Sequence, residues 1–293
     1  MSFVETPFFA KAAVTGASRS IGAILIDTGR LSTKNAEHIL RLQREQGKNF
    51  GDAAIELGLL SEDDIRFGLA RQFAYPYLAS DDASLSNELV AAYQPFSPVV
   101  EQLRALRSQL MLRWFDSETE RKALAIVSPG NGEGRSFMAA NLAIVFSQLG
   151  ERTLLIDADL RKPRQHDLFK LGKSSGLSGI LAGRAGIEAI MPVHSLLGLS
   201  VLPAGAVPPN PQELLGRPAF TETLSAHSSE FDVVIIDTPA GNEYADAQTI
   251  AVRAGAALML TRKNQSSLAE IVRLTKSLQQ FGATLVGSVL NDA

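Results

Sequence analysis

The sequence predicts an α/β protein with a doubly wound, mostly parallel sheet, preceded by a small all-α domain of helical hairpins. Apolar segments of strand length alternate with helical stretches from Ala123 onward, which is typical of a parallel sheet covered on both faces. A Gly-rich turn at residues 128–137 separates the first of these strands from an apolar helix. An internal repeat within residues 21–72 predicts the helical domain.

The repeat consists of two segments that align at a constant offset. They are IGAILIDTGRLSTKNAEHILRLQ (residues 21–43) and FGDAAIELGLLSEDDIRFGLARQ (residues 50–72). Each reads as a short apolar helix, a glycine stop and a second helix, with Ser32 and Ser61 as candidate N-caps. We expect residues 1–78 to form a docking or regulatory module in which the two hairpins pack on each other.

Composition limits the classes of function. Hydrophobic residues make up 45% of the chain and charged residues 20%, which is typical of a globular protein in the cytoplasm. The net charge of −3 argues against a general nucleic-acid binder. No cysteine is present, so disulfides and thiolate metal sites are excluded, and no apolar run approaches the length of a membrane span.

Residues 79–97 are polar, acidic and interrupted by proline, and we interpret them as a linker. Residues 98–293 form the predicted α/β domain. Its expected strands are ALAIVS, RTLLIDAD, LSVLPA, FDVVIID, AALMLTR and TLVGSVLN. Each is a short buried-type run, and helical stretches separate them.

The turn SPGNGEGRSF has the context of a phosphate-binding loop, because a strand enters it and the helix of residues 137–149 leaves it. Its N–H groups and the helix N-terminus would face a polyphosphate, and Ser136 would ligate Mg²⁺. Two positions depart from the strict pattern: Pro129 replaces the first glycine and Arg135 replaces the lysine. The alternative is a tight turn without a ligand.

Three aspartates follow predicted strands. Asp157 and Asp159 end the strand of LLIDADLR, and Asp237 ends that of VVIIDTP. Because the carboxyl ends of parallel strands share one edge, we expect these acids to converge with Ser136 around Mg²⁺. Each aspartate alone is equally typical of a helix N-cap.

These segments, together with GLSGILAG and LPAGAVPPNPQELL, resemble the bacterial tyrosine kinases that accompany exopolysaccharide and capsule export, over residues 97–291. The resemblance implies a fold of P-loop NTPase type, ATP and Mg²⁺ as cofactors, and a protein-tyrosine kinase that regulates exopolysaccharide chain length, polymerisation and export. It implies catalytic roles for Asp157, Asp159 and Arg135, and metal binding by Ser136, Asp159 and Asp237. It implies nucleotide binding by Gly130, Asn131, Gly132, Glu133, Gly134, Arg135, Ser136, Phe137 and Asn291.

The segment SPVVEQLRALRSQL carries Glu101, Arg104 and Arg107 in the arrangement that, by the same resemblance, packs protomers into a ring. On a helix, Val99, Leu103, Leu106 and Leu110 would form one apolar stripe beside the charged triplet. The alternative is a solvated Glu101–Arg104 pair that contributes only about 0.3–0.5 kcal/mol.

The N-terminal repeat resembles the module of secretion and pilus assembly ATPases, some of which bind cyclic di-GMP. The binding motif opens Arg-Leu-Gly, whereas this chain has Ser20-Ile21-Gly22 and Asn49-Phe50-Gly51, with Arg19 and Lys48 displaced by one position. A cyclic di-GMP site and a docking or packing module are therefore both open.

Arginine cannot occupy the volume of a lysine in the loop, because its planar fork is bulkier than an ammonium group. A kinase-impaired, nucleotide-binding assembly factor for polysaccharide export is therefore an alternative to an active kinase. A partitioning-type ATPase is a separate alternative. The chain also lacks the C-terminal tyrosine cluster of the family. Its tyrosines are Tyr75, Tyr77, Tyr93 and Tyr244, so the acceptor is expected on a protein substrate or at Tyr93.

The expected partner is the cytoplasmic segment of a membrane chain-length determinant. It would hold the protein at the inner membrane as a peripheral component. A homo-oligomeric ring is expected as well, and no nucleic-acid partner is expected.

Overall fold

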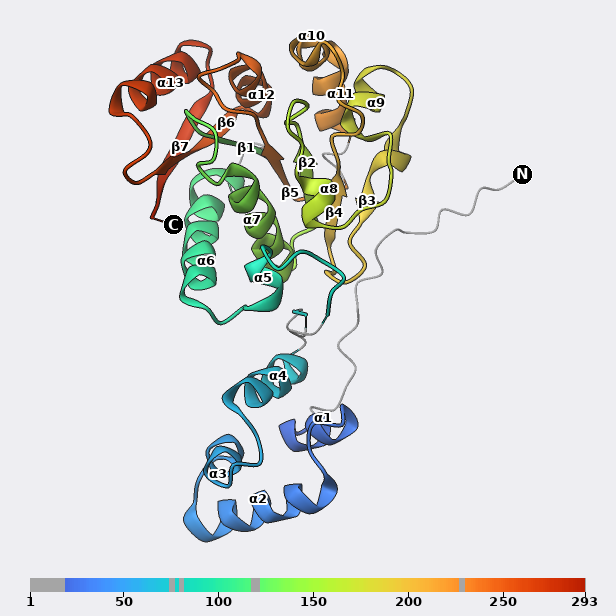
Figure 1. The fold of residues 1–293 in the computed structure, drawn as a ribbon, viewed down its shortest axis with the longest axis vertical. Coiled ribbons are helices and arrows are strands. Elements are labelled where there is room, and N and C mark those ends of the chain that lie inside the picture. Colours follow the sequence, from blue (N-terminus) through green and yellow to red (C-terminus); the bar gives the residue numbers. More distant parts are fainter. Residues whose placement is uncertain (1–18, 74–76, 79–81, 117–121, 227–229, 293) are drawn as a thin grey trace, which may run out of the picture. The chain divides into compact units, whose positions relative to one another are not determined.

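The computed structural model describes residues 19–73, 77–78, 82–116, 122–226 and 230–292. The chain divides into two compact units, Met1–Ala79 and Ser80–Ala293 (Figure 1). Tyr75 lies outside the described residues.

The first unit contains two helical hairpins in its described part. Its helices are α1 (Ile21–Asp27), α2 (Thr33–Gln46), α3 (Phe50–Glu56) and α4 (Glu62–Gln72). The predicted caps are confirmed: Ser32 accepts a hydrogen bond from the N–H of Asn35, and Ser61 forms a capping box with Asp64. The α1–α2 and α3–α4 turns therefore lie where the repeat predicts them.

Close helix packing explains the repeated glycines of this unit. A Cβ at Gly22 would lie 3.1 Å from the ring of Phe50, and one at Gly51 would lie 3.1 Å from Ile65. The displaced cations do not face these glycines; instead Arg19 pairs with Asp27, and Lys48 with Glu56, both at exposed positions. The repeat thus preserves a packing contact and an exposed ion pair in each copy.

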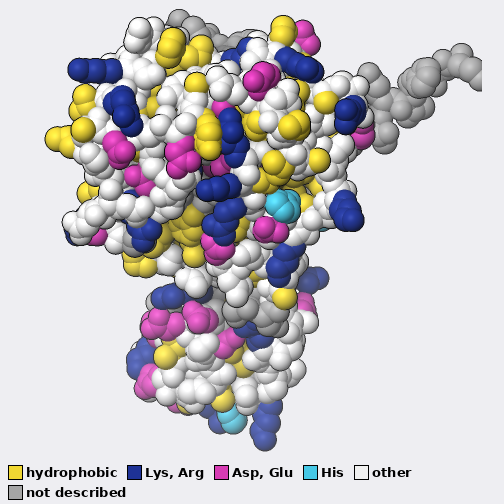
Figure 2. Space-filling model, turned by 45° about the horizontal axis from the view of Figure 1, so that its top comes forward, with side chains coloured by type: hydrophobic (Ala, Val, Ile, Leu, Met, Phe, Trp, Pro, Cys, Tyr) yellow, Lys and Arg dark blue, Asp and Glu magenta, His cyan; other side chains and the backbone are white. Residues whose placement is uncertain are grey.

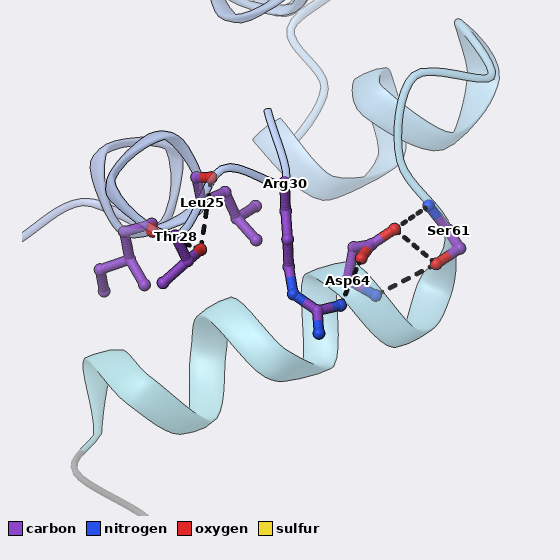
Figure 3. A network of polar contacts seen from close by, with 6 residues as sticks. Leu25, Thr28, Arg30, Ser61 and Asp64 are labelled. Carbon is purple, nitrogen blue, oxygen red and sulfur yellow. Dashed lines mark hydrogen bonds and ion pairs between the residues drawn. The ribbon is translucent and has the colours of Figure 1, made fainter. Parts of the chain in front are cut away.

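A polar network joins the two hairpins (Figure 3). Arg30 donates to Oδ1 of Asp64 at 2.8 Å, and Asp64 also accepts from the N–H of Ser61. The Arg30 guanidinium lies 4.2 Å from the centre of the Phe67 ring, within the range of a cation–π contact. Arg30 therefore connects the α1–α2 turn of the first hairpin to α4, the second helix of the other.

The structure corrects the linker expected at residues 79–97. From Asp82 the chain is packed on the second unit, with Leu85, Leu89, Ala91 and Ala92 buried. Helix α5 (Val90–Tyr93) contacts α7 (Arg135–Leu149), where the side chain of Asn141 accepts from the N–H of Ala91 and donates to the carbonyl of Glu88. Buried hydrogen bonds of this kind fix the segment although its composition is polar.

Helix α6 (Pro98–Leu110) carries the charged triplet and continues into a π-helical turn, η1 (Met111–Phe115). Its buried residues are Val100, Leu103 and Leu110, whereas Val99, expected in the stripe, is 48% exposed. Leu103 and Leu110 are buried as expected, and only the first position of the stripe differs, with Val100 in place of Val99. Arg107 donates to the carbonyl of Val145 on α7 at 2.9 Å.

The predicted doubly wound sheet is confirmed in the second unit. Its described strands are β1 (Ala123–Val127), β2 (Thr153–Asp157), β3 (Met191–Pro192), β4 (Leu199–Leu202), β5 (Val233–Asp237), β6 (Ala256–Arg262) and β7 (Thr284–Asn291), in the order β3-β4-β2-β5-β1-β6-β7. All neighbouring pairs are parallel except β3–β4. The six expected strands correspond to β1, β2 and β4–β7.

Helices cover both faces of this sheet (Figure 1). Helix α7 packs on β1, β2 and β5 with α5 and α6 behind it, and α12 (Asp246–Ala254) packs on β1 and β6 beside α13 (Leu268–Gln280). The remaining described helices are α8 (Gln165–Leu168), α9 (Gly176–Leu181), η2 (Ile187–Ala189), α10 (Pro211–Gly216) and α11 (Pro218–Ala226). Strands buried on both faces explain the continuous apolar runs in the sequence.

Replacing Gly205 by Ala is expected to destabilise the second unit by about 3 kcal/mol or more. Gly205 has a φ of 78°, and a Cβ there would lie 2.1 Å from the carbonyl oxygen of Ser175. The measurement is denaturant unfolding of both variants beside Gly172→Ala, a matched control whose Cβ meets nothing within 4 Å. Equal midpoints for Gly205→Ala and the control would contradict the packing described for this loop.

On the face shown in Figure 2, Lys and Arg side chains are interspersed with Asp and Glu side chains and do not form a single basic field. Within the described residues, none of the helices has both the length and the apolar character that crossing a membrane requires.

Candidate active site

The Gly-rich loop between β1 and α7 depends on left-handed glycines. Gly132 has a φ of 72° and Gly134 a φ of 99°, which are backbone conformations that residues with a Cβ rarely adopt. Gly134 immediately precedes α7, and a Cβ there would lie 2.8 Å from the amide nitrogen of Asn291. The loop therefore passes closely beneath the end of β7 and delivers the N-terminus of α7 to the rim of the sheet.

Residues of β7 and of the segment that follows β6 hold this loop in place. Glu133 is buried and its Oε2 accepts from the N–H of Gly130 at 2.7 Å, while its Oε1 is bonded by the hydroxyl of Ser266. Asn291 donates to the carbonyl of Glu133 at 3.1 Å. Both carboxylate oxygens of Glu133 thus stabilise the loop. If Glu133 takes part in binding a nucleotide, it would do so through its backbone N–H.

Two further residues that hold the loop in place, Arg262 and Gln265, were not predicted from the sequence. Arg262 donates to the carbonyl of Gly132 at 2.9 Å, and Gln265 donates to the carbonyl of Asn131 at 3.1 Å. Both lie at the end of β6 or just after it, more than a hundred residues from the loop, and no local motif marks them.

Arg135 begins α7 and is only 8% exposed. Its Nε donates to the carbonyl of Thr238 at 2.8 Å, and its Nη1 contacts the hydroxyl of Ser128 and the carbonyl of Gly130. Within the described residues, Nη2 of Arg135 forms no hydrogen bond. Nε and Nη1 therefore anchor the guanidinium inside the loop, and Nη2 is left without a hydrogen bond.

Asp157 and Asp237 lie side by side. They end the neighbouring parallel strands β2 and β5, where they are partners in the strand register, and both are fully buried. Asp159 follows two residues after Asp157 and is 7% exposed. The three acids predicted to converge are therefore gathered at one edge of the sheet.

Backbone N–H groups orient the two acids that follow β2. Oδ2 of Asp157 accepts from Arg164 at 3.1 Å and from Gln165 at 2.9 Å, and its Oδ1 accepts from Asp159 at 3.2 Å. Oδ1 of Asp159 accepts from the N–H groups of Arg161 and Lys162. Backbone N–H groups of the loop after β2 thus hold the carboxylates of Asp157 and Asp159 in a fixed orientation.

Gln165 connects these acids to the phosphate loop, and the sequence analysis missed it. Its Nε2 donates to Oδ2 of Asp237 at 2.8 Å and to the carbonyl of Ser136 at 3.2 Å. The only sequence signal for Gln165 is its place in the segment LRKPRQHDLF. The other oxygen of Asp237, Oδ1, is buried and has no hydrogen-bond partner among the described residues.

The crowding of carboxylates changes their proton affinity. Burial raises the pKa of Asp237 to about 6, although the hydrogen bond from Gln165, the nearby Ser136 hydroxyl and the charge of Arg135 act in the opposite direction. Burial, and then the neighbouring charge of Asp237, raise the pKa of Asp157 well above its usual range. Raised carboxylate pKa values in a confined site are a signature of functional acids and bases.

The carboxylate oxygens of this site are suitable ligands for Mg²⁺, but they do not provide a complete set of protein ligands. Asp237 Oδ1 is an unpartnered carboxylate oxygen, which is the ligand type that Mg²⁺ prefers. Among the described residues, no three His, Cys, Asp or Glu side chains are arranged to hold a metal ion by themselves. Mg²⁺ commonly takes one or two carboxylates and completes its shell with waters and substrate phosphates, so the residues present fit such an ion.

Comparison with known proteins places the chain in a family. The family model described as ParA, NUBPL iron-transfer P-loop NTPase, matches residues 119–292. EpsB of Ralstonia solanacearum is 37% identical over 203 residues, which are 69% of this chain and 27% of EpsB. CapB of Staphylococcus aureus is 33% identical over 198 residues, which are 68% of this chain and 86% of CapB. Both names assign those proteins provisionally to the tyrosine-protein kinases.

The solved kinase domain of Escherichia coli tyrosine kinase ETK is 33% identical, has a TM-score of 0.66, and is matched over 70% of this chain and 80% of that domain. The chain belongs to the bacterial tyrosine-protein kinases. This confirms the predicted family and the P-loop NTPase type of fold. The chain spans only about a quarter of the length of EpsB.

In this tyrosine-protein kinase family member, the expected oligomerisation residues lie on α6. Glu101 is exposed and pairs with Arg104, whereas Arg107 is bound to the carbonyl of Val145 within the same protomer. Phe137 is partly buried and Asn131 is exposed beside Glu243, whose carboxylate the Asn131 amide contacts.

Proposed function

We propose that the chain is an ATP-dependent protein-tyrosine kinase that regulates exopolysaccharide chain length, polymerisation and export. The observation that carries the proposal is the pair of buried acids, Asp157 and Asp237, joined through Gln165 to Ser136 at the start of α7. Family membership supports the same reaction class, and phosphoryl transfer requires this placement of charge more than any covalent chemistry by the protein.

In the proposed site, free N–H groups of the loop and the N-terminus of α7 bind the phosphates of ATP. Ser136, Asp237 and Asp159 would hold Mg²⁺, which when bound neutralises charge on the β- and γ-phosphate oxygens. Nη2 of Arg135 would supply a cation to the phosphates, while Nε and Nη1 stay anchored to the loop. The predicted nucleotide-binding residues, Gly130 to Phe137 and Asn291, would surround the bound nucleotide in this proposal.

Asp157 accepts the proton of the acceptor tyrosine in this proposal. Its raised pKa suits a general base, because proton transfer is most efficient when the pKa of the base lies near the working pH. The three backbone N–H groups that bond it keep the carboxylate in a constant orientation. Asp159 stands next to it as a supporting metal ligand.

The proposal includes a ring of protomers packed through Glu101, Arg104 and Arg107, and a tether to the cytoplasmic segment of a membrane chain-length determinant. That tether would make the protein peripheral to the inner membrane. For the N-terminal unit we favour docking over cyclic di-GMP binding, because Gly22 and Gly51 lie against Phe50 and Ile65 and not at an open surface.

Incubation with labelled ATP, Mg²⁺, the partner's cytoplasmic segment and a Glu–Tyr copolymer tests the function. We expect phosphotyrosine on the copolymer in amounts that exceed the free phosphate released. Free phosphate without phosphotyrosine would indicate a partitioning-type ATPase. Tight ATP binding with neither product would indicate a nucleotide-binding assembly factor, and either result would overturn the kinase proposal.

A further inference from the structure

The tyrosines in the described residues differ in the state of their hydroxyl groups. Tyr93, the expected acceptor, is engaged: its hydroxyl donates to the carbonyl of Leu85 and accepts from the N–H of Leu85, both at 3.1 Å. Tyr77 packs edge-on against Phe67, with ring centres 6.1 Å apart. Tyr244 is 43% exposed and has no hydrogen bond to its hydroxyl within the described residues.

Tyr244 lies on the loop that leaves β5, next to the proposed active site. The preceding residue, Glu243, contacts Asn131 of the phosphate loop, and Gly241 donates its N–H to the carbonyl of Ser128 at 2.9 Å. The exposed tyrosine is therefore attached to the wall of the phosphate loop and not to a distant surface.

The ring of Tyr244 is held from one side. The guanidinium of Arg161 lies 3.6 Å from the ring centre, and Arg161 also donates to both oxygens of the buried Asp246, at 2.7 and 3.2 Å. Because Asp246 anchors Arg161, the ring has a defined orientation although it is exposed. An ordered ring with an open hydroxyl is well suited to a reaction at that oxygen.

A hollow of about 330 Å³ is lined in part by Tyr244. Its lining includes Asn242, Gln248, Arg273 and Ser277. Arg273 is exposed and forms no ion pair within the described part of the chain. The hollow thus places an unpaired cation and hydrogen-bonding side chains beside the tyrosine.

We propose that Tyr244 is a phosphorylation site of this chain and that Arg273 receives the phosphate; the proposal rests on the kinase function proposed above. Tyr244 Oη forms a bond to the γ-phosphorus of ATP, the bond from that phosphorus to the β–γ bridging oxygen breaks, and ADP leaves. The hydroxyl proton passes to the Asp157 carboxylate of the catalysing site. The product carries about two negative charges at neutral pH, which an arginine fork binds well.

The test is mass-spectrometric mapping of phosphotyrosine after the full chain is incubated with MgATP, the partner's cytoplasmic segment and a Glu–Tyr copolymer. We expect phosphate on Tyr244, none at this position in Tyr244→Phe, and unchanged modification in Tyr93→Phe. In Arg273→Ala, an added tyrosine phosphatase should remove the phosphate about fivefold faster, since one exposed ion pair contributes about 1 kcal/mol.

The copolymer separates the two proposals. Phosphate on the copolymer but not on Tyr244 would overturn this inference and leave the kinase function standing. Absence of phosphate from both would overturn the kinase function and this inference with it. Equal phosphatase rates with and without Arg273 would overturn the receiving role of that arginine.

Discussion

Replacing Asp157 by Asn is expected to lower the rate of tyrosine phosphorylation by about 100- to 10,000-fold, the usual contribution of a positioned general base. Asparagine keeps one oxygen that can accept from the N–H groups of Arg164 and Gln165, but it loses the bond from the N–H of Asp159 and cannot take a proton from the tyrosine. Loss of a buried charge beside Asp237 should leave the fold intact or stabilise it, because the two acids repel each other. The measurement is phosphotyrosine formed per minute at saturating MgATP.

Asp167→Asn is the matched control, because Asp167 lies in α8 of the same segment but its carboxylate is exposed. This variant should retain the wild-type rate. If Asp157→Asn transferred phosphate within threefold of the wild type, Asp157 would not be the base, and the acceptor proton would have to leave by another route.

Replacing Arg135 by Ala is expected to destabilise the second unit by about 2–4 kcal/mol and to lower transfer by about 100-fold or more. The side chain is buried, and its removal leaves the carbonyls of Thr238 and Gly130 without the guanidinium that bonds them. It also removes the cation that faces the phosphates through Nη2. Denaturant unfolding and phosphotransfer, measured on the same preparation, check both effects.

Arg135→Lys separates anchoring from charge. A lysine supplies the cation but has a single nitrogen to divide between the loop and the phosphates, so we expect transfer within about tenfold of the wild type and a smaller loss of stability than for alanine. A lysine variant that transfers much faster than wild type would show that the arginine is a brake on the enzyme.

The sequence identified the sheet well because buried parallel strands read as continuous apolar runs. The strand that it missed, β3, has two residues, one of which is Pro192, so it offers no periodicity. Two members of the apolar stripe expected on α6, Leu103 and Leu110, are buried, but at its first turn Val100 is buried in place of Val99. A long charged side chain can run along a buried face and bond a carbonyl, as Arg107 does at Val145.

The candidate site was predictable only where a local motif exists. The glycines of the loop and the three aspartates stand in strand–loop contexts that the sequence shows. Gln165, Arg262, Gln265 and Ser266 lack such a signal, because each contributes through a contact with a residue far away in the chain. The segment after Asp82 was misread as a linker for the same reason: its partner, Asn141, lies on α7.

The most direct test of the account is calorimetric titration of ATP into the chain with and without Mg²⁺, for the wild type and Asp237→Asn. If Asp237 Oδ1 is a metal-facing ligand beside the phosphate loop, Mg²⁺ should tighten ATP binding at least about tenfold in the wild type and have little effect in the variant. The same ATP affinity in the wild type with and without Mg²⁺ would contradict the single metal–nucleotide site on which the proposed function depends.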